Sequence, residues 1–104
     1  MAEAPIDPEN CRSMTDVRAG VDDLDAAIVH LLARRFAYMR AAARIKPART
    51  DVRDEPRKAQ VIANARNMAV ELGIPADVVT DIWERLVEGS IAYELAAWDG
   101  RRGN

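Results

Sequence analysis

The sequence predicts an all-α protein with three helices per chain, the first of them much longer than the others. Apolar residues recur at alternating spacings of three and four over residues 14–45, which is the heptad-type pattern of a helix. Two later stretches, residues 55–72 and 75–98, carry helical apolar stripes bounded by proline or glycine. We predict no strands.

The first helix is predicted to begin near Met14, after a capping-box-like pair formed by Ser13 and Asp16, and to end before Pro47. Its length of about 50 Å exceeds the diameter of about 33 Å of a compact chain of this size. The chain alone therefore cannot cover the apolar seam of the helix. A partner helix is expected, and a symmetric homodimer is the simplest source of one. The seam consists of Met14, Val17, Val21, Leu24, Ile28, Leu31, Arg35, Tyr38, Ala42 and Ile45.

The second helix is predicted to begin at a cap formed by Asp54 or Glu55, with Pro56 in its first turn, where the missing N–H does no harm. Gly73 is expected to end it in a left-handed conformation. The third helix is expected to start near Pro75 and to end at about Trp98, before Asp99-Gly100.

Composition limits the function classes. A chain of 104 residues is one small domain, and a net charge of −2 argues against nucleic acid as a partner. One cysteine, no long apolar run and no signal peptide favour a soluble, cytoplasmic protein without a membrane partner. We expect a loose arm over residues 1–12, a helical domain over residues 13–99 and a short polar tail over residues 100–104. No metal-spaced cluster or phosphate loop is present, so no metal or cofactor is expected.

Charged residues interrupt the apolar stripes. Arg35 lies within the seam, and Lys46 falls on nearly the same face, about 20° away at about 100° per residue. A guanidinium that is always charged is rarely buried unless an anion meets it. Such an arginine can also be a surface group or half of a buried ion pair. The alternative that we pursue is a pocket for a small anionic molecule.

The other helices add polar groups to this pocket. Ser90 and Glu94 are four residues apart, stacked on the apolar face of the third helix, and Asp54 and Arg57 stand at the entry to the second helix. Each of them alone is a weak signal, since a glutamate beside a serine is usually solvated. Together with the two cations they predict a ring of polar groups around a ligand.

Arg18 raises a geometric problem. It precedes Arg35 by 17 residues, about 25 Å along a straight helix, which is too far for both to touch one small ligand. If Arg18 belongs to the site, it must come from the second protomer. The alternative is an exposed arginine paired with Asp22, one turn later.

Three stretches of the chain resemble the all-helical chorismate mutase family (the AroQ type), which includes related isochorismate pyruvate-lyases. They are VRAGVDDLDAAIVHLLARRFAYMRAAARIK, VRDEPRKAQVI and IWERLVEGSIAYEL, and the resemblance covers about residues 14–98. It implies an intertwined helical homodimer with two active sites. Each site borrows an arginine from the first helix of the partner.

The resemblance implies that the cations bind a dianionic substrate. Arg18 of the partner subunit and Arg35 are expected to bind its two carboxylates, and Arg57 to close the carboxylate side. Lys46 is expected to reach the ether oxygen and a carboxylate. The family also implies roles for three uncharged or acidic positions: Asp54 faces the ring hydroxyl, Ser90 binds the ring carboxylate, and Glu94 contacts the ether oxygen.

Two positions depart from the family pattern. Lys58 stands where a glutamate often helps to bind the substrate hydroxyl, and Glu94 stands where many members have glutamine. The expected function is chorismate mutase, which rearranges chorismate to prephenate in aromatic amino-acid biosynthesis. The alternatives are an isochorismate pyruvate-lyase, which gives salicylate and pyruvate, and a non-catalytic binding module on the same scaffold.

Overall fold

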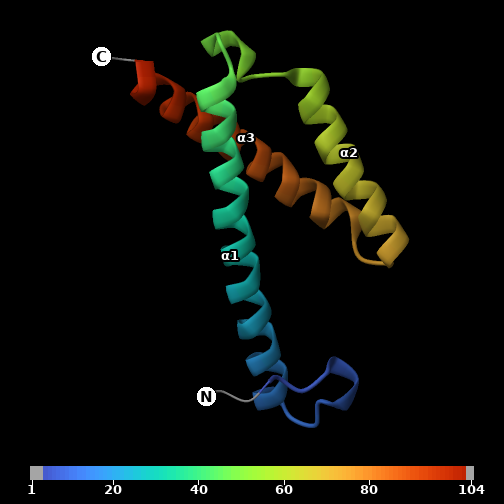
Figure 1. Ribbon diagram of the computed structural model, residues 1–104. Coiled ribbons are helices and arrows are strands. Elements are labelled where there is room, and N and C mark those ends of the chain that lie inside the picture. The colour runs from blue at the N-terminus through green and yellow to red at the C-terminus, as the bar shows by residue number, and fades with distance from the viewer. Residues whose placement is uncertain (1–3, 103–104) are drawn as a thin grey trace. The chain divides into compact units, whose positions relative to one another are not determined.

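A computed structural model describes residues 4–102, and within them the chain is all-helical with no strand (Figure 1). This confirms the predicted fold class. The chain divides into two compact units, one up to Arg35 and one from Phe36 onward. None of the helices described combines the length and the hydropathy that a membrane crossing requires. The elements are η1 (Pro8–Asn10), α1 (Met14–Ile45), η2 (Arg49–Asp51), α2 (Glu55–Leu72) and α3 (Ala76–Arg102).

In the first unit, α1 begins at the predicted cap. The Asp16 N–H donates to Ser13 Oγ at 3.2 Å, and the Arg12 N–H donates to Asp16 Oδ2 at 3.0 Å. The two side chains thus satisfy backbone donors that a helix leaves without an internal partner. The helix then continues without a break to Ile45, one residue before Lys46-Pro47.

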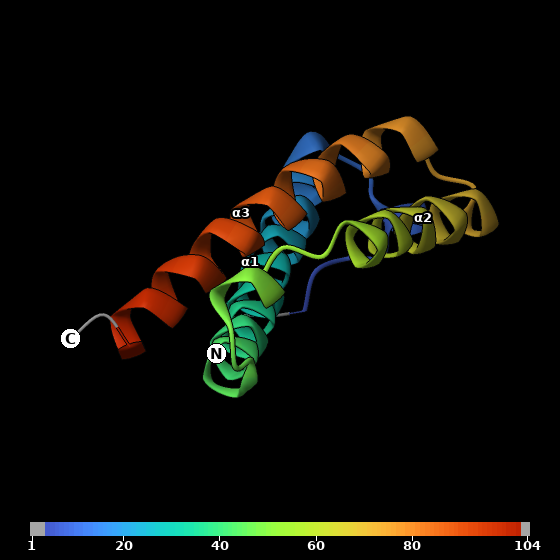
Figure 2. The same ribbon diagram turned by 90° about the horizontal axis from the view of Figure 1, so that it is seen from above.

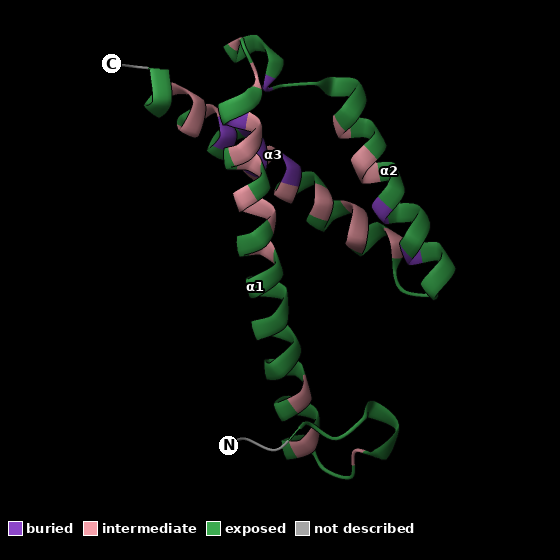
Figure 3. Cartoon of the chain, in the orientation of Figure 1, coloured by how far each residue is buried: buried purple, intermediate pink, exposed green. Residues whose placement is uncertain are grey.

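The apolar seam of α1 is open along its length, as predicted. Every large apolar side chain of the seam is exposed, for example Leu24 at 61% and Leu31 at 65% (Figure 3). Such a continuous apolar surface is unusual for a stable monomer and is typical of an interaction face.

In the second unit, α2 begins and ends at the predicted residues. Asp54 caps the helix, its Oδ1 accepting from the Arg57 N–H at 3.0 Å. Gly73 ends it with φ 71°, a left-handed conformation that costs glycine little. After this sharp stop, α3 starts at Ala76, close to the predicted position.

Small residues allow α2 to lie against α3 (Figures 1 and 2). Ala65 and Ala69 are buried on α2, where larger side chains would hold the two helices apart. Val52, from the connector before α2, packs with Val87 and Ile91 of α3 to form the centre of the core. The residues partly buried around that centre are Val61, Ile62, Trp83, Leu95 and Trp98.

The last turns of α1 pack on α3 within the same unit. The rings of Phe36 and Tyr93 meet edge to face, with centroids 4.8 Å apart. Arg40 donates to the Tyr93 hydroxyl at 2.7 Å. These contacts set the end of α1, which carries Lys46, against the middle of α3.

The predicted end of the third helix is wrong. We expected α3 to end at about Trp98, but it continues through Gly100 to Arg102. Glycine weakens a helix by about 1 kcal/mol, and tertiary contacts of Trp98, Asp99 and Arg102 offset that cost here. The division into arm, domain and tail remains a prediction, and residues 1–3 and 103–104 lie outside the described part of the chain.

Candidate active site

The centre of the candidate site is an ion pair between Lys46 and Glu94. Lys46 Nζ lies 2.7 Å from Glu94 Oε2, a charge-assisted hydrogen bond of good length. Glu94 is only 4% exposed, whereas the Lys46 side chain is 29% exposed. A carboxylate is rarely buried to this extent unless a cation accompanies it. Two residues predicted from separate helices are therefore brought into direct contact.

Ser90 lies one turn before Glu94 on α3 and is also buried, at 3% exposure. Its Oγ donates to the Leu86 carbonyl oxygen at 2.7 Å. This bond satisfies the hydroxyl within its own helix, which is a common arrangement for a helical serine. To donate to a substrate carboxylate, the hydroxyl must rotate away from that carbonyl.

Asp54 has the capping role that the sequence predicted, and Arg57 binds a neighbouring side chain of the same helix. The Asp54 carboxylate caps α2, and the Arg57 guanidinium donates to Gln60 Oε1 at 2.7 Å. Both residues are exposed. Their predicted contacts with the substrate remain predictions.

Lys58, the position that departs from the family pattern, is held by carboxylates of α3. Its Nζ lies 2.8 Å from Glu88 Oε2 and 3.4 Å from Glu84 Oε2. Arg53, in the connector, donates to both oxygens of Glu88, at 2.8 and 3.1 Å. The hydrogen bonds from Arg53 and then from Lys58 lower the pKa of Glu88 from 4.5 to about 2. Glu88 could not be recognised from the sequence, because its partners Lys58 and Arg53 are 30 and 35 residues away.

Arg18 and Arg35 lie on α1 in the first unit. Arg18 is exposed and Arg35 is half-buried. The alternative pairing of Arg18 with Asp22 does not form in the described residues. The expected contribution of Arg18 to a partner's site stays a prediction.

The end of α3 holds the backbone that carries Lys46. Trp98 Nε1 donates to the Lys46 carbonyl oxygen at 3.1 Å, and Arg102 donates to the same oxygen at 3.1 Å. Arg49, in η2, makes a two-pronged ion pair with Asp99, at 2.8 and 3.2 Å. The hydrogen bond from Arg49 lowers the pKa of Asp99 below its ordinary value. These contacts could not be predicted from the sequence, because each joins residues 50 or more positions apart.

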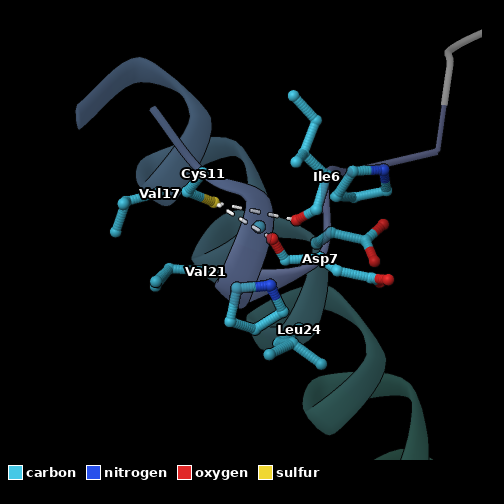
Figure 4. Close-up of a pocket in the computed structure, with 10 residues that line it drawn as sticks. Ile6, Asp7, Cys11, Val17, Val21 and Leu24 are labelled. Carbon is cyan, nitrogen blue, oxygen red and sulfur yellow. Dashed lines mark hydrogen bonds between the residues drawn. The ribbon is translucent and has the colours of Figure 1, made fainter. Parts of the chain in front are cut away.

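A separate apolar hollow of about 370 Å³ lies in the first unit, between residues 5–11 and the first turns of α1 (Figure 4). Val17, Val21 and Leu24 of the seam form its floor. The Cys11 thiol points back to the carbonyl oxygens of Ile6 and Asp7, at 3.8 and 3.6 Å. The hollow contains none of the predicted site residues.

Comparison with known proteins identifies the family of the chain. The chain matches the family described as chorismate mutase type II over residues 17–95. It is 30% identical over 96 residues to an isochorismate pyruvate lyase of Pseudomonas aeruginosa, covering 92% of this chain and 95% of that protein. It is 28% identical over 82 residues to a T-protein of Enterobacter agglomerans, covering 78% of this chain and 22% of that protein. The chain therefore belongs to the chorismate mutase type II family.

Proposed function

We propose that this protein is a chorismate mutase that rearranges chorismate to prephenate. The observation that carries the proposal is the ion pair between the half-buried Lys46 and the buried Glu94, with buried Ser90 one turn away from Glu94 on the same helix. This cluster combines a cation with a hydrogen-bonding carboxyl group that is shielded from water. Such a place suits an ether oxygen that gains negative charge during the reaction.

The rearrangement of chorismate requires no covalent bond between the substrate and the protein. One C–O bond breaks while one C–C bond forms within the same molecule. A catalyst can hold the flexible dianion in its folded, reactive conformer, and it can stabilise the developing charge. In our proposal Arg35, Arg57 and Arg18 of the partner subunit hold the carboxylates, because a planar guanidinium matches a carboxylate in two-pronged fashion. Lys46 supplies a point charge at the ether oxygen.

The role of Glu94 depends on whether its side chain is protonated. An ionised carboxylate only accepts hydrogen bonds, so it repels an oxygen that gains negative charge. A protonated Glu94 donates a hydrogen bond instead. We propose that the active form carries a neutral Glu94, with Lys46 turning from Glu94 to the substrate on binding.

A homodimer completes the site in this proposal. The exposed seam of α1 supplies an apolar face for a second copy, and Leu24 and Leu31 lie near its middle. Pairing two such faces removes the seam from water, at about 25 cal/mol for each Å² of apolar surface buried. It also allows Arg18 of one subunit to reach the site of the other.

The test is to incubate the purified protein with chorismate and with isochorismate in separate reactions. We expect prephenate from chorismate, and no prephenate from an Arg35→Ala variant purified in the same way. The variant controls for mutase carried over from the expression host. If neither substrate reacts, the proposal is refuted; heat released on titration with a bicyclic dicarboxylate analogue then supports a binding module.

A second candidate function is isochorismate pyruvate-lyase. The similarity to the Pseudomonas aeruginosa lyase extends over 95% of that protein. In addition, Lys58 presents an ammonium held by Glu88 where a substrate-binding glutamate is common in mutases. The lyase reaction moves a hydrogen within isochorismate as the C–O bond breaks. Salicylate and pyruvate from isochorismate, with a higher kcat/KM than for chorismate, identify this function in the same assay.

A further inference from the structure

The C-terminal end of α1 is closed by side chains from the last turn of α3. The last carbonyl groups of any helix have no partner within the helix. Arg102 donates to the carbonyl oxygens of Ala43 at 2.9 Å, Arg44 at 3.3 Å and Lys46 at 3.1 Å. Its positive charge also interacts favourably with the negative end of the helix dipole.

Arg102 is itself held in place. Its guanidinium carbon lies 4.5 Å from the centroid of the Trp98 ring, a cation–π contact. Trp98 in turn donates from Nε1 to the Lys46 carbonyl oxygen at 3.1 Å. Lys46 therefore receives two donors on its backbone, and its side chain points to Glu94, 2.7 Å away.

The connector after Lys46 is tied to the same turn. Pro47 follows Lys46 directly, so no helix continues beyond it to hold this backbone. The Arg49–Asp99 ion pair fastens η2 to α3 two residues further on. The backbone around Lys46 is thus held by three side chains from the end of α3, those of Trp98, Asp99 and Arg102.

We propose that Trp98 and Arg102 are positioning residues for Lys46, so that the end of α3 sets the place of the catalytic ammonium; this rests on the proposed function. A fixed backbone keeps Nζ where charge develops in the transition state. Displacements of about 1 Å at such a group cost up to about 100-fold in rate. The loss from Arg102 is smaller, because Trp98 still holds the Lys46 carbonyl.

The test compares Arg102→Ala with Arg101→Ala. Arg101 precedes Arg102 and carries the same charge, and its exposed side chain makes no hydrogen bond or ion pair among residues 4–102. We expect Arg102→Ala to lower kcat by about 3- to 10-fold, with KM changed by less than about 2-fold. Arg101→Ala should keep both constants. Arg102→Lys should recover part of kcat, since an ammonium reaches one carbonyl but cannot bridge three.

A measurement without substrate separates this inference from the proposed function. Hydrogen exchange of the Lys46 amide, which donates to the Ala42 carbonyl at 2.9 Å, reports how firmly the end of α1 is held. We expect faster exchange in Arg102→Ala than in the wild type and no change in Arg101→Ala.

Equal exchange in the two variants overturns the positioning role. So does an active wild type whose kcat is the same in both variants. If Arg102→Ala does not fold, Arg102→Lys gives the same comparison. If the wild type is inactive but the Lys46 amide exchanges faster in Arg102→Ala, the proposed mutase function is overturned. The role of Arg102 in holding the end of α1 is then still supported.

Discussion

Lys46 Nζ and Glu94 Oε2 lie 2.7 Å apart, although 48 residues separate them in the sequence. One stands directly after α1 and the other in the middle of α3. The carboxylate is almost fully buried, and the ammonium forms an ion pair with it. A charge pair in such a place costs desolvation energy, so its presence favours a chemical role over a purely structural one.

Glu94→Gln tests whether the reaction needs a hydrogen-bond donor at this position. An ionised carboxylate only accepts hydrogen bonds, whereas the neutral amide of glutamine donates to the ether oxygen. We therefore expect Glu94→Gln to have a higher kcat than the wild type at pH 7 to 8. The measurement is kcat for prephenate formation by both proteins under the same conditions. A variant that is less active than the wild type contradicts the proposal.

Complementation between inactive variants tests the shared site. Arg18→Ala and Arg35→Ala should each abolish activity as homodimers. If Arg18 acts in the partner's site, a heterodimer of the two has one site with both arginines and one with neither. Refolding an equal mixture should then restore about a quarter of the wild-type activity, since half of the dimers are mixed and each has one intact site. If no activity returns although mixed dimers form, both arginines act within one chain.

Glu88 predicts a pH-dependent contribution to stability. Its pKa is lowered from 4.5 to about 2 in the folded protein, so its interactions stabilise the fold fully above about pH 4.5. This contribution is lost as the pH falls from 4.5 towards 2. Glu88→Gln should therefore be less stable than the wild type at pH 7, and the difference should vanish near pH 2. Urea unfolding at several pH values measures it.

A matched control for Glu88 is Glu71→Gln. Glu71 is an exposed glutamate of α2 without an ion pair in the described part of the chain. Its substitution should change stability little at any pH. A difference between Glu88→Gln and the wild type that stays constant from pH 7 to 2 contradicts the role assigned to the Arg53 and Lys58 contacts.

Gly73→Ala tests the turn between α2 and α3. Space is not the obstacle, because a Cβ at this position meets nothing within 4 Å. The left-handed backbone is the obstacle, and we expect alanine to lower the free energy of unfolding by about 1 kcal/mol. Gly73→Asn should cost less, since asparagine tolerates this conformation. Gly100→Ala, inside α3 and equally unhindered, should raise stability by up to about 1 kcal/mol. Destabilisation of both alanine variants contradicts this explanation.

Much of the secondary structure could be predicted because its causes are local. The Ser13–Asp16 pair, the Asp54 cap and the Gly73 stop each act within four residues, and each lies at the predicted boundary. The end of α3 was wrong for the opposite reason. Gly100 is a local signal to stop, and the contacts of Arg102 with the end of α1 outweigh it.

The sequence by itself determined the family, the three helices and the residue types of the candidate site, since periodicity, caps and motifs are properties of short stretches. It also indicated an apolar seam that one chain leaves open. Only the tertiary structure decided that Lys46 meets Glu94, that Arg53 and Lys58 share Glu88, and that Arg102 closes α1. Those contacts join residues 30 or more positions apart, and their distances depend on how the helices pack, which no local pattern encodes.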